Sequence, residues 1–368
     1  MNQRLTHICI VVGARPNFIK VAPLLRAFAQ HSDVECRLVY TGRTDEASLE
    51  PTIFDDLQMP RPDVSFAVDS TQLNEITSRV MHEMDLYLDH CPTDIVIVVD
   101  DLASTMAAAI VAKKRGIRLA HLVAGTRSFD IKMPKEINRL VIDALSDYLF
   151  TAGYKSNSVA AREQAENAGT FMVGNILIDS LRFNFSRFRK PEFSANAATQ
   201  HILDGDYIVF TLNRRQLLAA PDKLSAILQA LAAGTEGIPI IAPLRENAAA
   251  VVGQLLGQTT ADTSHIHIVT PMNYLEFGWL TAHATGIVTD SGNIAEEATF
   301  NGVPCITLNA YTEHQETVTQ GTNVLAGEDC QILSDHLRLM ISHQWKHHTL
   351  PERWDGRTAE RIVKILTA

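Results

Sequence analysis

The residues best suited to chemistry form a polar turn between an apolar run at 284–288 and a helical pattern that follows it. The turn contains Asp290, Ser291 and Gly292. Asp290 or Ser291 can cap the helix, and Gly292 lets another molecule approach the backbone. Free amides and the helix dipole attract anions there, most often phosphate. Glu297 follows one to two turns later, where its carboxylate can accept hydrogen bonds from sugar hydroxyls. For the turn alone, an ordinary capped helix stays open as the alternative.

Cationic side chains stand at the ends of two other apolar runs. Arg15 and Lys20 follow the first run, and the pair Arg214 and Arg215 follows a later one. Open α/β sheets bind ligands at the carboxyl ends of their strands, so these cations are placed to neutralise a bound anion. Taken alone, the arginine pair is equally typical of a solvated loop.

Short apolar runs alternate with amphipathic helical patterns along nearly the whole chain. Strands are predicted at 7–12, 35–40, 94–99, 118–122, 148–151, 170–173, 207–211, 238–242, 265–269, 284–288 and 303–308. Helices are predicted at 16–28, 74–88, 104–114, 134–145, 156–168, 221–233, 247–256, 274–282, 294–301, 335–342 and 351–366. This alternation predicts an α/β fold with doubly wound parallel sheets. A chain of 368 residues favours two domains, and the pattern breaks between 177 and 206, where we expect a linker with some helix.

The composition is that of a globular protein, with 46% hydrophobic and 20% charged residues. A formal charge of −10 argues against general nucleic-acid binding. No apolar run reaches the roughly 18–20 residues that a membrane span needs. Residues 1–4 lead directly into a strand, so we expect no signal peptide. The five cysteines show neither CxxC nor metal spacing, which predicts free thiols in a reducing cytoplasm and no metal site.

The chain resembles the UDP-N-acetylglucosamine 2-epimerase family in three ordered stretches. These are GARPNFIK at 13–20 followed by APL at 22–24, PKEINR at 134–139 followed by GNILID at 174–179, and TDSGNIAEEA at 289–298 followed by GVP at 302–304 and TE at 312–313. The resemblance implies two Rossmann-like domains of the glycosyltransferase-B type that face a cleft. Residues 1–176 would form the sugar side and residues 177–350 the nucleotide side, and a helix in 351–368 would pack back on the first domain. It also implies a cytoplasmic homodimer that takes a UDP-sugar as substrate and needs no cofactor.

The resemblance also assigns roles to individual residues. Ser291 and Gly292 would meet the diphosphate, and Glu297 the ribose hydroxyls. Arg15 and Lys20 match basic residues of the family's active site. The remaining nucleotide or substrate positions are Asn213, Arg214, Arg215, Asp290, Glu313 and His314.

Members of this family eliminate UDP and add it back with C2 inverted, which needs an acid/base pair and help for the leaving diphosphate. Asp101 matches the aspartate of a Gly-Asp-Thr segment, in which Asp100 and Leu102 replace the glycine and the threonine. With Asp101, we expect Glu136 and Lys20 to carry the chemistry. A helix-start carboxylate favoured by the dipole is the alternative for Glu136.

The chain departs from the family where the sugar should lie. Val123 stands in place of a glutamate, Lys135 in place of the first glutamate of Pro-Glu-Glu, and Asn213 in place of a histidine. His314 replaces an arginine, and with Glu136 and Asp130 it is among the nearest substitutes for the lost groups. Loss of one general acid or base typically costs about 10²–10⁴-fold in rate.

Three hypotheses therefore stay open. The first is a 2-epimerase of a UDP-sugar. The second is a diverged enzyme that transfers or hydrolyses the sugar, and the third is a catalytically silent UDP-sugar binder.

Overall fold

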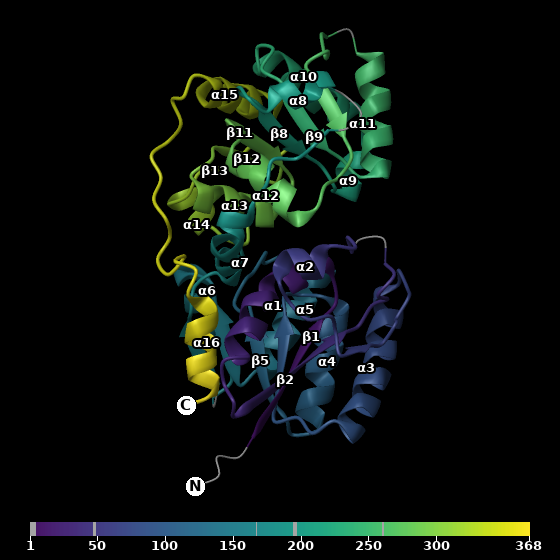
Figure 1. Cartoon of the computed structure of the whole chain (residues 1–368), viewed down its shortest axis with the longest axis vertical. Coiled ribbons are helices and arrows are strands. Elements are labelled where there is room, and N and C mark those ends of the chain that lie inside the picture. The colour runs from purple at the N-terminus through teal and green to yellow at the C-terminus, as the bar shows by residue number, and fades with distance from the viewer. Residues whose placement is uncertain (1–4, 47–48, 167, 194–196, 260) are drawn as a thin grey trace. The chain divides into compact units, whose positions relative to one another are not determined.

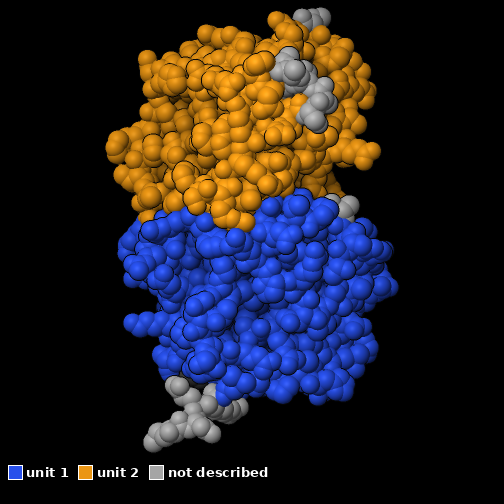
Figure 2. Space-filling view, in the orientation of Figure 1, with its two compact units in different colours: residues 1–183, 352–368 blue, residues 184–351 orange. Residues whose placement is uncertain are grey.

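The structure is a computed structural model that describes residues 5–46, 49–166, 168–193, 197–259 and 261–368. The chain forms two compact units, Met1–Phe183 with Glu352–Ala368 (unit 1) and Asn184–Pro351 (unit 2), shown in blue and orange in Figure 2. The expectation about a signal peptide concerned residues 1–4, and part of the expected linker was 194–196. Both segments lie outside the described residues.

Among its described residues, unit 1 forms a seven-stranded parallel sheet in the order β3-β2-β1-β4-β5-β6-β7 (Figure 1). The strands are β1 (Thr6–Val12), β2 (Val34–Tyr40), β3 (Val64–Ser65), β4 (Ile95–Val99), β5 (Arg118–Leu122), β6 (Tyr148–Thr151) and β7 (Gly169–Met172). Ile10 of β1 aligns with Leu38 of β2 and with Ile97 of β4. Every residue of β4 is buried, as expected for a parallel strand that is covered on both faces.

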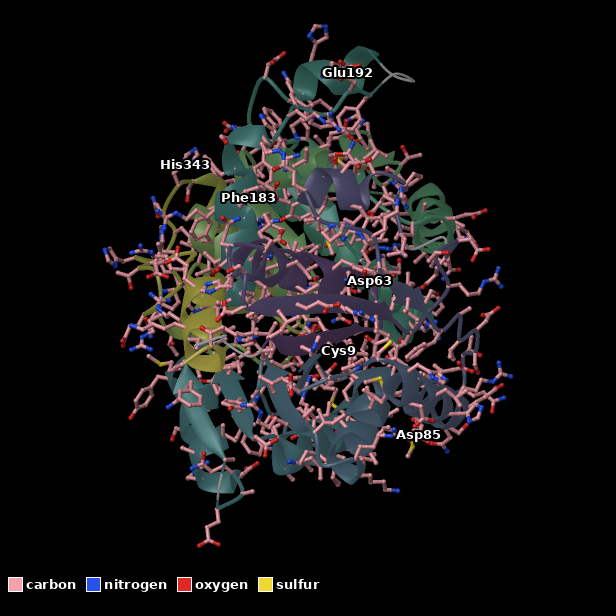
Figure 3. All side chains as sticks on the ribbon, turned by 60° about the horizontal axis from the view of Figure 1, so that its bottom comes forward. Cys9, Asp63, Asp85, Phe183, Glu192 and His343 are labelled. Atoms are coloured by element: carbon pink, nitrogen blue, oxygen red, sulfur yellow. The ribbon has the colours of Figure 1, made fainter. Side chains whose placement is uncertain are left out.

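The helices of unit 1 pack on its sheet. They are α1 (Arg15–Phe28), α2 (Ile53–Leu57), α3 (Leu73–His90), α4 (Ala103–Lys114), α5 (Pro134–Leu145), α6 (Tyr154–Glu163), α7 (Ile176–Asn184) and α16 (Thr358–Leu366). One apolar core joins α3, α4 and α5 to the sheet, where Met84, Ala108 and Ile142 pack with Cys9 and Val96. Cys9 is labelled on β1 in Figure 3. All five cysteines of the chain are free thiols.

The C-terminal helix belongs to unit 1 and contacts α1. It begins at Thr358, so the prediction of a helix from residue 351 was wrong for its first part. Arg353 and Gly356 have φ angles of 62° and 71°, which a right-handed helix does not allow. The carboxylate of Asp179 on α7 then accepts hydrogen bonds from the amides of Thr358 and Ala359 and so caps the helix.

Unit 2 has, within the described residues, a six-stranded parallel sheet in the order β10-β9-β8-β11-β12-β13. The strands are β8 (Ile208–Thr211), β9 (Ile240–Pro243), β10 (Ile266–Val269), β11 (Gly286–Thr289), β12 (Cys305–Thr307) and β13 (Asn323–Leu325). The helices are η1 (Phe185–Arg187, a 3-10 turn), α8 (Ala197–Ile202), α9 (Arg215–Leu218), α10 (Pro221–Gly234), α11 (Glu246–Gln258), α12 (Tyr274–Ala282), α13 (Gly292–Asn301), α14 (Glu316–Thr319) and α15 (Cys330–Ile341).

Two separate cores show that helices cover both faces of the second sheet. Phe210 of β8 packs with Leu228 of α10 and Leu337 of α15. The neighbouring residue of the same strand, Val209, belongs to the core that contains Leu280 of α12. Successive strand residues point to opposite faces, so this sheet is doubly wound. The predicted fold class is confirmed.

Differences from the predicted elements are local. The strands β3 and β13 and the short helices α2, α9 and α14 were not predicted. The helix expected at 156–168 ends at Glu163. The helix expected at 335–342 begins at Cys330, because the side chain of Asp329 accepts hydrogen bonds from two amides of its first turn. No helix in the described part of the chain is both long and apolar enough to cross a membrane.

Candidate functional site

The two cations predicted in unit 1 lie on α1, and each is held by a carboxylate. The Nε atom of Arg15 lies 2.6 Å from an oxygen of Glu50. Lys20 is 5% exposed, and its Nζ atom lies 2.6 Å from Oδ1 of Asp100. Asn17 donates a hydrogen bond to the other oxygen of Asp100. Asp100 therefore ties the end of β4 to α1, and an anionic ligand would compete with Glu50 and Asp100 for these cations.

Asp100 has a left-handed backbone, with a φ of 57°. This conformation suits glycine, the residue that the family resemblance places here. Aspartate tolerates it better than most residues, and its carboxylate gains two partners from α1. Val123, another position where the resemblance implies a departure from the family's pattern, has a φ of 72°. A β-branched residue is a clear outlier there, so the backbone of this turn is strained.

Asp101 lies in a buried cluster with two cations. Its Oδ2 atom accepts hydrogen bonds of 2.9 and 2.5 Å from the guanidinium of Arg139, which is 1% exposed. The ammonium of Lys135 lies 3.4 Å from its Oδ1 atom. Burial alone would raise the pKa of the Asp101 carboxyl, but Lys135 and Arg139 hold it below its usual range. Asp101 is therefore a carboxylate at neutral pH.

Glu136 points into the same cluster, but its oxygens are already engaged. One accepts hydrogen bonds from the amide and hydroxyl of Ser128 and from Arg139, and the other from the amide of Phe129. Burial would raise the pKa of Glu136, and these hydrogen bonds outweigh it, so the pKa is lowered. Glu136 therefore holds the loop before α5 in place. Arg139 bonds to both Asp101 and Glu136 and so joins the two carboxylates.

A second buried network beneath this cluster was not predicted. His121 of β5 lies 2.5 Å from Asp143 through Nδ1 and 3.0 Å from the carbonyl oxygen of Asp100 through Nε2. Asp143 also lies 2.7 Å from Arg127, which reaches Glu163. Burial would raise the pKa of Asp143, but His121 and Arg127 lower it. The one signal in the sequence that pointed to this network was a histidine between apolar residues of β5, Ala120 and Leu122.

In unit 2, Asp290 holds the turn that follows β8. Its carboxylate accepts hydrogen bonds of 2.7 and 2.5 Å from the amides of Asn213 and Arg214. Burial raises the pKa of Asp290 despite these two bonds. Ser291 occupies the N-cap position of α13, as one of the two expected candidates, but its hydroxyl makes no capping bond. Asp290 bonds instead to the turn after β8. The amide of Ser291 donates to Thr289.

The start of α13 is open. Gly292 is the first residue of this ten-residue helix, and a Cβ atom built on it would meet no atom within 4 Å. The Nη2 atom of Arg214 lies 2.5 Å from Oε1 of Glu328. The Nε atom of Arg214 is buried and has no hydrogen-bond partner among the described residues. Arg215 begins α9 and is exposed.

The residues of unit 2 that were predicted to contact the ribose and the sugar are largely buried. Glu297 is 6% exposed on α13. His314 is equally buried, and its Nε2 atom lies 3.6 Å from Glu296, the residue before Glu297. Glu313 is partly exposed beside it. The structure thus brings Asn213, Arg214 and Asp290 into direct contact, while His314 approaches α13 one residue before the predicted ribose ligand.

Comparison with known proteins agrees with this architecture. The family model of the UDP-N-acetylglucosamine 2-epimerases matches residues 26–367. The UDP-N-acetylglucosamine 2-epimerase of Methanocaldococcus jannaschii is 32% identical over 374 residues, 98% of each chain. The UDP-2,3-diacetamido-2,3-dideoxy-D-glucuronate 2-epimerase of Pseudomonas aeruginosa is 33% identical and covers 91% of this chain, which in turn covers 92% of it.

A solved structure extends the match to three dimensions. It is the M. jannaschii UDP-GlcNAc 2-epimerase in complex with UDP-GlcNAc and UDP, at 30% sequence identity and a TM-score of 0.84. The alignment covers 98% of this chain and 99% of the solved one. The two parallel α/β units are thus those of a glycosyltransferase-B-like fold, and the chain belongs to the UDP-N-acetylglucosamine 2-epimerase family.

Proposed function

We propose that this chain binds a UDP-sugar and acts on it as a 2-epimerase, with the diphosphate held at the start of α13. The open space at Gly292 is the observation that carries the proposal. A helix start with free amides attracts phosphate, and Gly292 leaves room for the phosphate oxygens to reach them. Arg215 is exposed near the turn that Asp290 anchors, and it would add charge-assisted hydrogen bonds. The M. jannaschii relative, solved with UDP-GlcNAc, supports this ligand class.

In unit 1 we assign the proton transfer at C2 to Asp101. Arg139 and Lys135 keep it ionised, so it can accept the C2 proton while the bond between C1 and the diphosphate oxygen breaks. UDP then adds back as a proton returns to the opposite face of C2, which inverts that carbon. Glu136 acts through Arg139 and the loop that it clamps, and Lys20 supplies positive charge next to Asp101. General acid–base catalysis by such a group contributes about 10²–10⁴-fold.

A second candidate is a diverged enzyme or silent binder that never exchanges the C2 proton. The specific observation in its favour is the pairing of Lys135 with Asp101 at 3.4 Å, since Lys135 replaces a family carboxylate. Val123 can neither accept nor donate a proton, and Asn213 does not titrate near neutral pH.

One experiment separates these candidates. UDP-GlcNAc is incubated with the protein in D₂O, and both C2 and the anomeric phosphate are followed by NMR. The epimerase predicts deuterium at C2 and the 2-epimer, and both should be absent with Asp101→Asn. Free UDP together with unepimerised sugar would identify a hydrolase. Measurable UDP binding without turnover would exclude the epimerase and the hydrolase, and would leave a silent binder or a transferase without its acceptor.

We also infer a cytoplasmic homodimer, as the family resemblance implies. Five free thiols support a reducing compartment. Ile137 and Leu140 on α5 are 46% and 37% exposed and offer an apolar surface for a second copy. Analytical ultracentrifugation measures the oligomeric state directly.

A further inference from the structure

The buried ring of His121 faces two hydrogen-bond acceptors in unit 1. His121 lies on β5 and is 1% exposed. Its Nε2 atom lies 3.0 Å from the carbonyl oxygen of Asp100, and its Nδ1 atom lies 2.5 Å from Oδ1 of Asp143. A carbonyl oxygen accepts hydrogen bonds and cannot donate them, so Nε2 carries a proton. The function proposed above gives this ring no part.

The second ring nitrogen of His121 faces a carboxylate. The other oxygen of Asp143 lies 2.7 Å from Arg127 and accepts a hydrogen bond from the amide of Gly125. Burial would raise the pKa of Asp143, but His121 and Arg127 lower it. An ionised carboxylate only accepts hydrogen bonds, so Nδ1 carries a proton as well and the ring is an imidazolium. Glu163 pairs with Arg127, so that two cations face two carboxylates, as buried charges require.

The carbonyl group that His121 holds belongs to the peptide unit between Asp100 and Asp101. Rotation of this rigid unit changes the φ angle of Asp101 and therefore the direction of its side chain. Asp100 itself has a left-handed φ of 57°, and a residue other than glycine keeps such a conformation only when its surroundings hold it. The hydrogen bond from Nε2 therefore fixes the backbone from which the Asp101 carboxylate extends.

Helix α5 supports this turn at several points. The side-chain amide of Asn138 donates a hydrogen bond of 2.8 Å to the carbonyl oxygen of Asp101, and Arg139 holds the Asp101 carboxylate. Asp143, the partner of His121, lies one turn further along the same helix. Both carbonyl groups of the turn are thus held, one directly from α5 and the other from α5 through the imidazolium.

We infer that His121 is a positioning residue for the proton transfer at C2: held as an imidazolium by Asp143, it fixes the carbonyl group of Asp100 and so orients the carboxylate of Asp101. The inference rests on the proposed function where it takes Asp101 as the base. The hydrogen bonds and the protonation of the ring follow from the geometry alone. A misplacement of about 1 Å in a reacting group can cost about 100-fold in rate, so the orientation of Asp101 matters.

Two substitutions of His121 distinguish its ring nitrogens. The amide nitrogen of glutamine takes the place of Nε2 and can donate to the Asp100 carbonyl, whereas that of asparagine takes the place of Nδ1 and cannot reach it. With UDP-GlcNAc in D₂O, His121→Asn should lower kcat for deuterium incorporation at C2 by about 10- to 100-fold. KM and UDP affinity should stay unchanged, and His121→Gln should restore most of the lost kcat.

His7→Asn and His7→Gln are the matched controls. His7 lies on β1 of the same sheet and pairs with Glu35 at 3.1 Å. Both control variants should keep the wild-type kcat. Equal losses of kcat in His121→Asn and His121→Gln, or a change in KM without a change in kcat, would contradict the positioning role. Thermal unfolding of each variant gives the folded fraction to which kcat is referred.

The protonation of the ring is tested on the wild-type protein, whether or not the variants fold. Nitrogen-15 NMR at neutral pH should show both ring nitrogens of His121 protonated, with the Nε2 proton protected from exchange with solvent. A ring with one unprotonated nitrogen would overturn the inference.

Failure of this inference is distinguishable from failure of the proposed function. A wild-type protein without deuterium at C2 contradicts the proposed function, but the orientation of Asp101 is still measured by carbon-13 NMR of its carboxyl group. This group should titrate at a higher pH in His121→Asn than in the wild type, because the turn no longer holds it against Arg139. An unchanged titration in His121→Asn would refute the positioning role even in an active epimerase.

Discussion

The two units treat charge at their strand ends in opposite ways. In unit 1, the candidate catalytic groups neutralise one another: Lys20 binds Asp100, and Asp101 binds both Arg139 and Lys135. In unit 2, the start of α13 stays open, and Arg215 is exposed next to the turn that Asp290 holds. The start of α13, where we propose that the diphosphate binds, thus has room for a ligand. The charged groups around the proposed catalytic residues of unit 1 are mostly paired with one another.

This difference falls at positions where the resemblance implies a departure from the family's pattern. There Lys135 would stand in place of a carboxylate and Asp100 in place of a glycine, and each of these two charges has an ion-pair partner. Val123, expected in place of a glutamate, brings no titratable group to a turn with a strained backbone. Around Asp101, the carboxylate stays paired with the cations of Lys135 and Arg139.

The largest effect should come from breaking the cluster of unit 1. Arg139→Met leaves Asp101 and Glu136 buried without their shared cation, which typically costs about 3–5 kcal/mol. Lys135→Met removes the other, half-exposed partner of Asp101 and should cost less than about 1 kcal/mol. Native-state hydrogen exchange of the β4 and β5 amides measures the opening free energy of unit 1 alone.

Lys135→Met serves as the matched control, because it acts on the same carboxylate. Equal losses in the two variants would show that Asp101 is solvated in solution, and the contrast between the units would then weaken. A large loss for Arg139→Met alone would show that the cluster is a buried structural unit.

A smaller effect should appear at the open helix start of unit 2. Gly292→Leu places a side chain where the diphosphate is proposed to lie, and UDP affinity should fall by at least about tenfold, or roughly 1.4 kcal/mol. The fold should tolerate the change, since a Cβ there meets no neighbour. Isothermal titration calorimetry gives the affinity, and thermal unfolding checks the fold.

Gly257→Leu is the control, because this glycine of α11 also faces open space. It should leave UDP affinity unchanged. If Gly292→Leu behaves in the same way, the diphosphate does not bind at α13, and the open helix start is only a surface feature.

The fold could be predicted from the sequence because long buried strands leave a clear signal. The mostly apolar runs 95–99 and 284–288 are bounded by polar turns, and β4 (Ile95–Val99) and β11 (Gly286–Thr289) lie at these runs. β3 has two residues and β13 has three, and neither lies in an apolar run as long as the one at 303–308, which predicted the equally short β12. They are strands only because a neighbouring strand offers them hydrogen bonds.

The sequence predicted which residues lie at the candidate sites better than it predicted the contacts that these residues make. The family resemblance singled out Asp101 and Glu136, but Arg139 was not recognised as the cation that joins them. The clamp of Glu136 on the amides of Ser128 and Phe129 depends on a loop whose course no local pattern specifies. Asp290 was assigned to its own helix, whereas it bonds to a turn 76 residues away in sequence.

The smallest expected effect concerns two aspartates, Asp101 after β4 and Asp290 after β11. Their contributions to the free energy of unfolding should depend on pH in opposite directions. The ordinary pKa is 3.8; that of Asp101 is lowered, and that of Asp290 is raised. The stability that Asp101 contributes is present above pH 3.8 and is lost as the pH falls through its folded pKa. The contribution of Asp290 is present below pH 3.8 and is lost as the pH rises through its folded pKa. The destabilisation caused by Asp101→Asn should therefore shrink toward acid, and that caused by Asp290→Asn should shrink toward neutral pH. Hydrogen exchange in each unit measures how the loss of opening free energy in each variant changes with pH. If both losses change in the same direction, the two aspartates do not differ in the way that their opposite pKa shifts imply.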